Sequence, residues 1–472
     1  MPVEKRHWHF GVLSFTGTGH LNALISLSQE LRDRGHKVTF VEKPKIESRV
    51  RQAGLDFFPI GVANPSKRVA PPSSKSNVLS EISLLRFNLA RIRQDMELFL
   101  RQTPHALKTA GVDALLINEI AVTGPTVAEM LGLPYFLIST SVPHRLGWRG
   151  RSWLTGYRSS SSWLSWMQSV FLEVSALRVR GPIRRTLEQY RRQAGLGTLQ
   201  KASSQFPPLA HITQLPQCLD LARKSLPKNF YYTAPFVSNA ARPQTEFPWE
   251  KLDGRPLIYA SLGTTRNVQP AVFRFIAEAC QDLDVQLVIS LGKRFDCEVF
   301  SDLPGQPLVI RYVPQLELLK IAQIVITHGG PNTVFEALMA GKPMLAIPLA
   351  VDQPAIAARL AQLHAAIVLP VMRLSALRIR AAVKLLLNDG SYRDAARELQ
   401  SILQSFRGPA QASDIIDAAL ERYFKSQLTN AAADSPGRGY GGPTFRSAQP
   451  YVRRIKDSSA SMALSRSRYF NS

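Results

Sequence analysis

The sequence is poor in cysteine. Only three of its 472 residues are cysteines, Cys218, Cys280 and Cys297, and they lie far apart in the chain. An odd number of cysteines without metal-ligand spacing argues against a disulfide framework and against a structural zinc site. We therefore expect the protein to work in a reducing compartment.

Long apolar runs are also missing. No stretch of about 18 uncharged apolar residues occurs, so the sequence predicts no membrane-spanning helix. The first residues, MPVEKRHWHF, lack the apolar segment and the cleavage site of a secretory signal. We therefore expect a soluble, cytoplasmic protein.

Acidic residues are few relative to basic ones. The chain has 58 Lys and Arg against 35 Asp and Glu, a net charge of +23. Much of this charge lies in two stretches: residues 145–201 hold eleven basic and two acidic residues, and residues 425–472 hold eight and two. A basic protein often binds nucleic acid. Neither stretch contains a nucleic-acid recognition motif, so we expect no nucleic-acid partner.

The rest of the composition is that of a folded protein, with 45% hydrophobic residues in a chain long enough for about two domains. The strand HFGVLSF (9–15) is followed by the turn TGTGH (16–20), an amphipathic helix over 21–34 and the strand KVTFVE (37–42). Strands at 114–118 and 134–140 continue the alternation. Such a βαβ series predicts a parallel sheet covered by helices.

A second series follows a proline-rich stretch near residues 243–248. Strands are predicted at 256–262, 286–291, 307–313, 324–327 and 343–348, with helices between them. The fold class is therefore α/β, with two doubly wound, Rossmann-like domains facing a cleft, where ligands of such folds bind. We place the domains at 1–240 and 241–408, a C-terminal helix at 409–424, and a basic, disordered tail at 425–472.

The strongest local motif is ITHGGPNTVFEALMAGKPMLAIPLAVDQ (326–353). A strand ends at His328, two glycines form a turn, and Asn332 with Thr333 are expected to cap the next helix. The start of a helix reached through such a turn offers unpaired backbone N–H groups and the positive end of the helix dipole. The motif therefore predicts a phosphate or nucleotide site.

Together with YVPQLELLKIA (312–322), the motif resembles the signature of family 1 glycosyltransferases. The resemblance extends over residues 8 to about 424. It implies a GT-B fold, a nucleotide-diphosphate sugar as donor and no metal cofactor. Consistent with the last point, no acidic cluster suitable for Mg²⁺ occurs near the motif.

The resemblance assigns two groups of residues to the donor. Those expected around the diphosphate are Ser261, Gly263, His328, Gly330, Asn332 and Thr333. Those expected at the base, the ribose and the sugar are Tyr312, Val313, Gln315, Glu336, Asp352 and Gln353, with Glu336 on the ribose and the last two on the sugar hydroxyls.

His20 stands where the family has its catalytic base. An imidazole takes a proton from a hydroxyl near neutral pH. The family orients this histidine with an aspartate at the end of the strand that here reads DALLIN, but this chain has Asn118, followed by Glu119. The asparagine carbonyl can accept a hydrogen bond from the ring N–H of His20, but it supplies no negative charge. We therefore expect either that His20 is a weaker base or that Glu119 takes the place of the aspartate.

The acceptor is expected to be hydrophobic and hydroxylated. The sequences at 247–267 and 153–163 resemble the subgroup that glycosylates carotenoids, the zeaxanthin glucosyltransferase type. Residues 145–201 also contain four of the six tryptophans, and residues 163–177 have an aromatic and apolar helical face followed by arginines. Such a helix suits a lipid-like acceptor or an anionic membrane surface, which makes peripheral membrane association a further hypothesis.

These patterns favour an inverting hexosyltransferase that uses UDP-glucose and glycosylates a carotenoid such as zeaxanthin. Two alternatives remain open at this point. One is a glycosyltransferase for a macrolide, phenolic or sterol-like acceptor. The other is a protein that binds nucleotide sugars without turnover, which the asparagine at position 118 suggests.

Overall fold

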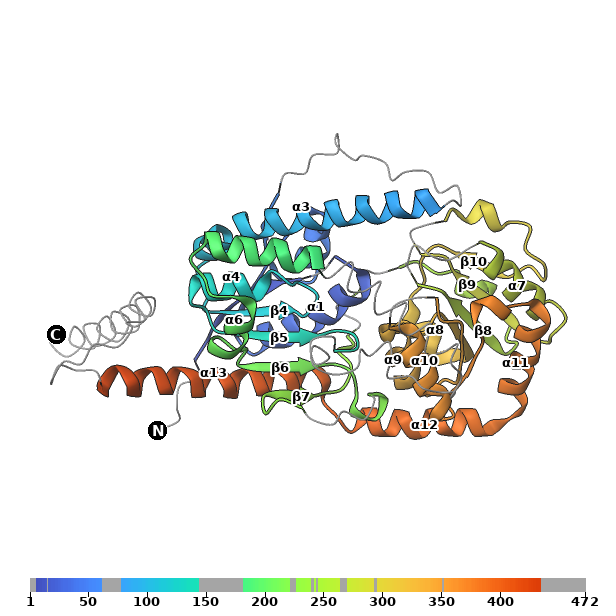
Figure 1. Cartoon of the computed structure of the whole chain (residues 1–472). Helices are drawn as coiled ribbons and strands as arrows, with labels where there is room; N and C mark the ends of the chain where they lie inside the picture. The colour runs from blue at the N-terminus through green and yellow to red at the C-terminus, as the bar shows by residue number, and fades with distance from the viewer. Residues whose placement is uncertain are drawn as a thin grey trace, which may run out of the picture.

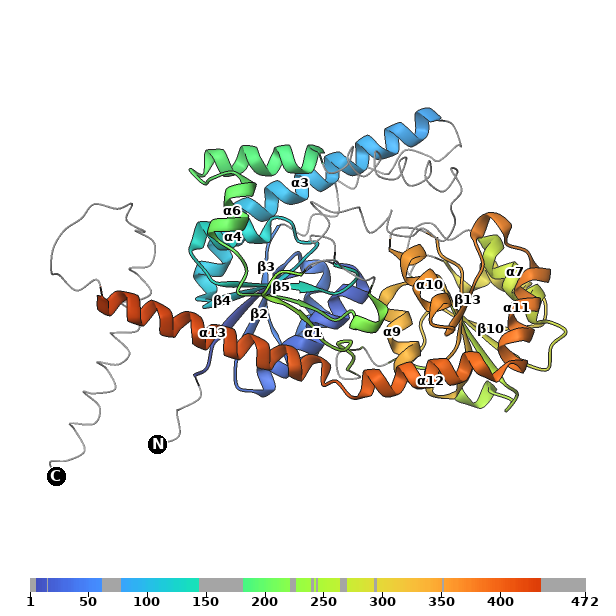
Figure 2. The same cartoon turned by 60° about the horizontal axis from the view of Figure 1, so that its bottom comes forward.

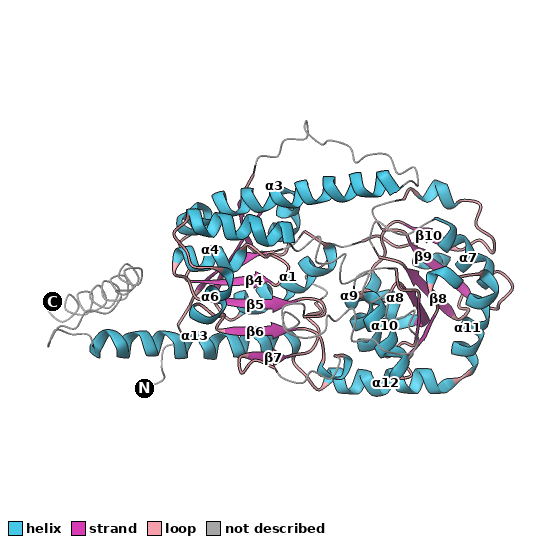
Figure 3. Ribbon diagram, in the orientation of Figure 1, coloured by secondary structure: helices cyan, strands magenta, loops and turns pink. Residues whose placement is uncertain are grey.

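The computed structural model describes residues 6–14, 16–61, 78–143, 181–220, 226–238, 242, 245–263, 270–292, 295–349 and 352–433. These residues form two parallel sheets, each in its own domain, with helices packed around them (Figures 1 and 3).

The first sheet has the strand order β3-β2-β1-β4-β5-β6-β7. Its strands are β1 (His9–Leu13), β2 (Lys37–Glu42), β3 (Asp56–Pro59), β4 (Ala114–Asn118), β5 (Tyr135–Ser139), β6 (Ala210–Thr213) and β7 (Phe230–Tyr232). Strand β1 pairs with β2 on one side and with β4 on the other. The direction in which the chain winds therefore reverses between β1 and β4, which is where doubly wound folds bind ligands.

The second sheet has the order β10-β9-β8-β11-β12-β13. Its strands are β8 (Leu257–Ser261), β9 (Gln286–Ser290), β10 (Leu308–Ile310), β11 (Ala322–Thr327), β12 (Met344–Ala346) and β13 (Ala366–Val368). Strand β8 pairs with both β9 and β11, so the reversal here lies between β8 and β11.

Helices cover both sheets. In the first half of the chain they are α1 (Thr18–Asp33), α2 (Glu47–Gln52), α3 (Val78–Ala110), α4 (Gly124–Leu131) and α6 (Leu199–Gln205), and residues 181–193 are also helical. In the second half they are α7 (Pro270–Cys280), α8 (Gln315–Ile321), α9 (Pro331–Met339), α10 (Gln353–Gln362), α11 (Ala376–Asn388), α12 (Gly390–Gln404) and α13 (Gly408–Ala433).

Strand β4 shows why these sequences form buried strands. Ala114 and Leu116 pack into a core shared with α1, whereas Leu115 and Ile117 pack into a core shared with α3 and α4. Successive side chains of a strand point to opposite faces. A strand with helices on both sides is therefore apolar at every position, as ALLI is here.

The sequence prediction of two doubly wound α/β domains is confirmed, and the strands at 37–42 and 114–118 begin and end at the predicted residues. Four strands were not predicted: β3, β6, β7 and β13. Each has only three or four residues, which is too short to show a period of its own.

Helix α13 returns to the first domain. It follows α12 along one side of the molecule and crosses the first sheet beside α1 (Figures 1 and 2). Its residues Ile416, Leu420 and Phe424 are buried in the same core as β1 and α1, and Phe424 stacks on Trp8 with ring centroids 4.5 Å apart. The predicted helix at 409–424 is therefore part of the core of the first domain.

The prediction that a disordered tail starts at residue 425 is wrong for residues 425–433. They continue α13, and the alanines at 431–433 explain why, because alanine has the highest intrinsic helix propensity. The rest of the predicted tail, 434–472, lies outside the described residues.

Residues 144–180 lie outside the described residues too, and with them the tryptophan-rich helix predicted at 163–177. The membrane-surface hypothesis therefore stays a prediction. Within the part of the chain that the structure describes, no helix has both the length and the apolar composition needed to cross a bilayer.

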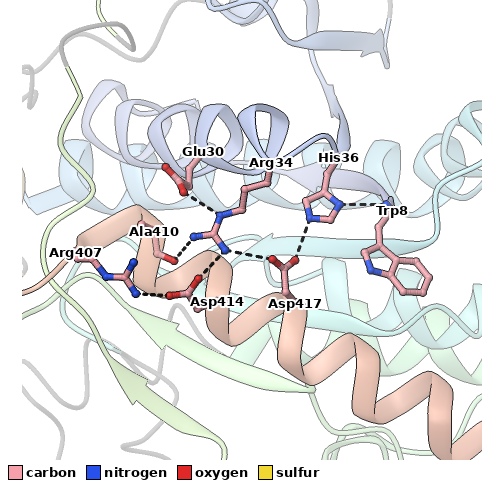
Figure 4. Close-up of polar contacts among 8 residues, drawn as sticks. All are labelled: Trp8, Glu30, Arg34, His36, Arg407, Ala410, Asp414 and Asp417. Carbon is pink, nitrogen blue, oxygen red and sulfur yellow. Dashed lines mark hydrogen bonds and ion pairs between the residues drawn. The ribbon is translucent and has the colours of Figure 1, made fainter. Parts of the chain in front are cut away.

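A partly buried polar network fixes α13 to the first domain (Figure 4). Nη1 of Arg34 donates to Asp414 (2.7 Å) and Asp417 (3.2 Å). The Nε2 atom of His36 lies 3.0 Å from Oδ1 of Asp417, and its Nδ1 atom accepts from the backbone N–H of Trp8 (3.1 Å). Because Nδ1 is an acceptor, the proton of neutral His36 resides on Nε2 and is donated to Asp417.

This network predicts an acid-sensitive contribution to stability. Burial raises the pKa of the Asp417 carboxyl, but the hydrogen bonds from His36 and Arg34 outweigh it, so the pKa lies below its ordinary value. A carboxyl with a lowered pKa stabilises the fold above its unfolded pKa of about 3.9 and loses that contribution as the pH falls through its folded pKa.

Accordingly, Asp417→Asn should lower the free energy of unfolding by about 2 kcal/mol at pH 7, because it removes the charge that pairs with Arg34 and replaces one of the two accepting oxygens with an NH₂ group. The difference between the variant and the natural chain should begin to shrink near about pH 4 and shrink further towards about pH 2. Urea unfolding at several pH values measures it. A difference that stays constant over this range would show that the carboxylate charge is not involved.

Candidate functional site

The loops at the carboxyl ends of the central strands carry most of the predicted site residues. In the first domain, His20 follows β1 and Asn118 ends β4, on the two sides of the point where the strand order reverses. In the second domain, Gly263 follows β8 and His328 follows β11, again on the two sides of such a point. The two reversal points therefore supply the two halves of one candidate site.

His20 is connected to Asn118 through Thr140. The Nδ1 atom of His20 lies 2.5 Å from the hydroxyl oxygen of Thr140, and Nδ2 of Asn118 donates to the same oxygen at 3.0 Å. Asn118 and Thr140 are buried, and His20 is partly exposed. Thr140 follows β5 and was not predicted as a site residue, because a threonine at the end of an apolar strand has no motif that marks it.

Glu119 was the alternative partner of His20. Its carboxylate accepts from the hydroxyl of Ser139 (2.5 Å), which also lies 2.7 Å from Nε2 of His211. The ring nitrogen of His211 is itself 3.9 Å from Glu119. Glu119 thus belongs to a buried cluster with residues of β5 and β6, whereas Asn118 contacts the hydroxyl that His20 contacts.

The start of α9 meets the start of α1 across the boundary between the domains (Figures 1 and 2). A Cβ atom built on Gly19 would overlap the side-chain amide of Asn332. Buried Gln214 donates from Nε2 to the carbonyl of Thr140 (2.6 Å) and to Oδ1 of Asn332 (3.0 Å). Gln214 therefore connects the surroundings of His20 with the start of α9.

The prediction that Asn332 and Thr333 cap this helix is wrong. Helix α9 begins at Pro331, with Gly330 in the N-cap position. Proline favours the first helical position because its fixed φ suits the helix and its missing N–H is not needed there. Asn332 is thus already inside the first turn, where its side chain bonds across the domain boundary, and Thr333 is half-buried beside it.

His328 is enclosed by glycines. Cβ atoms built on Gly263 and Gly330 would both overlap its ring. Burial lowers the pKa of His328 to about 4, against a weaker opposing contact with the backbone of Ser261. The imidazole is therefore neutral at pH 7, and its buried Nδ1 atom has no hydrogen-bond partner among the described residues. A ligand with polar oxygens would complete this site.

Substitution of Gly263 tests this packing. A side chain at this position would be penalised both by the φ of +71° and by the contact with His328, and a comparison with Gly195 separates the two costs. Gly195 has a φ of +69° and nothing within 4 Å of an added Cβ atom. Gly195→Ala should cost about 1 kcal/mol for the left-handed backbone alone. Gly263→Ala should cost about 1–3 kcal/mol more, because the ring of His328 has to move. Urea unfolding of both variants measures the difference, and equal losses would contradict the close packing.

Glu336, predicted to bind the ribose, is buried and already engaged. One carboxylate oxygen forms an ion pair with Arg242, and the other accepts from Nε2 of Gln315 at 2.5 Å. Oε1 of Gln315 in turn accepts from the hydroxyl of Tyr259 (2.8 Å). Each carboxylate oxygen still has a second lone pair, so a ribose hydroxyl would bind Glu336 beside Arg242 and Gln315. Arg242 lies between the domains, and no local sequence pattern predicted it as a site residue.

The other predicted donor residues lie at or near the same edge. The hydroxyl of Tyr312 is buried without a hydrogen-bond partner among the described residues, and Val313 packs against the core beneath it. Ser261 ends β8 and is buried. Asp352 occupies the N-cap position of α10, and Oε1 of Gln353 accepts from the backbone N–H of Leu349 (2.8 Å).

No group of three or more His, Cys, Asp or Glu side chains that could hold a metal ion occurs among the described residues. The expectation that the site needs no metal stays a prediction.

Comparison with known proteins identifies the family. The sequence model of the UDP-glucoronosyl and UDP-glucosyl transferases matches residues 66–407, well over half of the chain. The chain belongs to this family of glycosyltransferases. Its predicted membership of the family 1 glycosyltransferases is thereby confirmed.

Relatives of this glycosyltransferase include two zeaxanthin glucosyltransferases. That of Pantoea ananas is 28% identical over 434 residues, covering 87% of this chain and 96% of the relative. That of Pseudescherichia vulneris is 30% identical over 364 residues, covering 75% and 84%. The crystal structure of the kitacinnamycin glycosyltransferase superposes with a TM-score of 0.68 at 23% identity, covering 88% of this chain and all of that one. The fold is therefore that of GT-B glycosyltransferases.

Proposed function

We propose that this glycosyltransferase moves glucose from UDP-glucose to a hydroxyl group of an apolar carotenoid such as zeaxanthin, with inversion at the anomeric carbon. The observation that carries the proposal is the meeting of α1 and α9 at Gly19 and Asn332. This contact supports the proposal, because Gly19 precedes His20, the proposed base, and Asn332 lies in the first turn of the helix proposed to bind the diphosphate.

In this reaction His20 takes the proton of the acceptor hydroxyl as its oxygen bonds to the anomeric carbon. The bond between that carbon and the diphosphate breaks on the opposite side, and UDP leaves. The N–H groups in the first turn of α9 favour the negative charge that develops on the diphosphate. His328 donates one hydrogen bond to the diphosphate. Its imidazole is neutral at pH 7 because burial lowers its pKa to about 4.

Support for the acceptor comes from the relatives. The two zeaxanthin glucosyltransferases are 28% and 30% identical to this chain over most of its length. At this identity the reaction type is expected to carry over more faithfully than the acceptor pocket, because pocket residues change with little effect on the fold.

The test is incubation of the purified protein with UDP-glucose and zeaxanthin in detergent micelles, with products read by mass spectrometry. A sterol and a simple phenol serve as competing acceptors. Addition of hexose to zeaxanthin in preference to both supports the proposal. Transfer only to the sterol or the phenol would overturn the acceptor, and binding of UDP-glucose without transfer to any of the three would overturn the enzymatic function proposed here.

A further inference from the structure

An apolar strip lies exposed on the second domain. It extends from the 3₁₀ turn Val371–Arg373 onto helix α11, which lies on the outside of this domain in Figures 1 and 2. Met372 is 95% exposed, and Leu377, Leu385 and Val371 are 77%, 46% and 39% exposed. Single exposed apolar residues are ordinary on a protein surface. Four large ones within residues 371–385 form a patch, and such patches mark interaction sites.

Helix α11 is apolar on two opposite sides. The residues that it buries in the core of the second domain are Ile379, Ala382, Val383 and Leu386. On the other side, Leu377, Ala381 and Leu385 follow one another at intervals of four residues, so their exposed side chains lie in one row. A surface helix ordinarily has polar residues on its outer side. The core of the domain therefore does not account for this row, which together with Val371 and Met372 we call the α11 strip.

Hydrogen bonds fix the turn that carries Met372 beside the start of α11. The hydroxyl oxygen of Ser375, the N-cap residue, accepts from the backbone N–H of Arg378 (3.4 Å). Nη1 of Arg378 in turn donates to the carbonyl of Arg373 (3.1 Å), the last residue of the turn. Met372 is therefore held next to the first turn of α11, which carries Leu377. The two most exposed residues of the α11 strip belong to a built segment of the fold.

The charge around the α11 strip is positive. Residues 366–388 contain four basic side chains and no aspartate or glutamate. Arg380 pairs with Asp282, which follows α7, at 2.8 Å. The other three, Arg373, Arg378 and Lys384, are exposed and form no ion pair with any described residue. Apolar side chains flanked by unpaired cations suit the head-group region of an anionic bilayer, where the apolar groups leave water and the cations meet phosphates.

We propose that the α11 strip binds the surface of an anionic lipid bilayer, with Met372 and Leu377 in the head-group layer and Arg373, Arg378 and Lys384 at the lipid phosphates. A second copy of the chain suits the strip less well. In a two-fold symmetric dimer the strip would meet itself, so each unpaired cation would face other cations. Anionic lipid supplies the opposite charge instead.

The α11 strip begins at the edge of the second sheet that carries the candidate site. The turn Val371–Arg373 follows β13, His328 follows β11, and β11, β12 and β13 pair in parallel. Both segments therefore leave the sheet at its carboxyl edge. Binding of the strip to a bilayer would bring this edge close to an acceptor dissolved in the lipid. That consequence rests on the proposed function, whereas the binding of lipid does not.

The first test is flotation of the full chain with vesicles of phosphatidylcholine and with vesicles that also contain phosphatidylglycerol in equal parts. We expect binding to the anionic vesicles, and Met372→Asp/Leu377→Asp should lower the partition coefficient at least about tenfold, because two apolar groups no longer leave water. Val299→Asp/Leu428→Asp is the matched control, since it adds the same charge at residues that are 59% and 45% exposed elsewhere. Equal binding of both variants, or no binding of the natural chain, would overturn the proposal.

The second test concerns the cations. Arg373→Gln/Lys384→Gln should lower the partition coefficient on the anionic vesicles about 25-fold, since each basic residue near such a surface contributes about fivefold. Arg393→Gln/Arg397→Gln removes the same charge from exposed positions of α12 and is the control. If the two double variants lose equal affinity, only the net charge of the chain matters and the α11 strip is not the binding surface.

A third measurement separates lipid from a second copy of the chain. Light scattering without vesicles reads self-association, and hydrogen exchange with and without anionic vesicles reads the peptides that cover residues 370–378. We expect a monomer whose exchange in these peptides slows on the vesicles. A dimer that Met372→Asp/Leu377→Asp dissolves would assign the strip to self-association and overturn the proposal. None of the three tests depends on glucosyl transfer, so a failure of the proposed function leaves their outcomes unchanged.

Discussion

His20→Ala should lower kcat for glucosyl transfer about 10²- to 10⁴-fold, the range that general base catalysis typically contributes. The acceptor hydroxyl is a weak nucleophile until it loses its proton, and no other imidazole among the described residues contacts Thr140 in this way. The buried His211 is held by Ser139 and Glu119, and His328 stands on the predicted diphosphate side beside Gly263 and Gly330.

Binding of UDP should be unchanged in His20→Ala, because the ring of His20 contacts Thr140 of the first domain and is not one of the residues predicted to bind the donor. Steady-state kinetics with UDP-glucose and zeaxanthin, together with calorimetric titration of UDP, separate the two effects. His105→Ala is the matched control, since this histidine is exposed on α3. A His20→Ala variant as active as His105→Ala would show that another group, or the solvent, removes the acceptor proton.

Phe424→Ala should lower the free energy of unfolding of the first domain by about 3–5 kcal/mol, the usual cost of removing a buried phenylalanine ring. The ring is 4% exposed and stacks on Trp8, while Ile416 and Leu420 of the same helix are fully buried. Loss of the ring leaves a cavity between α13 and the first sheet, which backbone movement fills only in part.

The control for Phe424→Ala is Leu428→Ala, one turn further along α13. Leu428 is 45% exposed, so its truncation should cost well under 1 kcal/mol. Urea unfolding followed by far-UV circular dichroism is suitable, because the fluorescence of six tryptophans would not report on Trp8 alone. Equal effects of the two substitutions would mean that α13 contributes little to the core of the first domain.

Much of the fold could be read from local pattern. KVTFVE and ALLIN form β2 and β4 at the predicted residues because a strand buried on both faces is apolar throughout. The short strands β6 and β13 escaped prediction, since three or four residues do not show a period. These strands form because β6 pairs with β5 and β13 pairs with β12. Such pairing is a tertiary interaction.

The candidate site could be predicted only in part. His328 and Glu336 are marked by a motif with fixed spacing, and the structure places His328 in the turn between β11 and α9 and Glu336 in the second turn of α9. No motif marks the residues that contact the predicted side chains. They are Thr140 at His20, Gln214 at Asn332 and Arg242 at Glu336. Their partners lie 94 to 120 residues away in the chain. A contact over such a separation leaves no periodic trace in the sequence.

The sequence by itself determined the architecture and the reaction family of this protein. Hydrophobic periodicity acts over a few residues, and the donor motif is contiguous, so both can be read without coordinates. Only the tertiary structure decided that α13 belongs to the core of the first domain, that Asn332 bonds across the domain boundary instead of capping its helix, and that Asn118 reaches His20 through Thr140. Each of these depends on the position of one element relative to another, which is set by the packing of the whole chain.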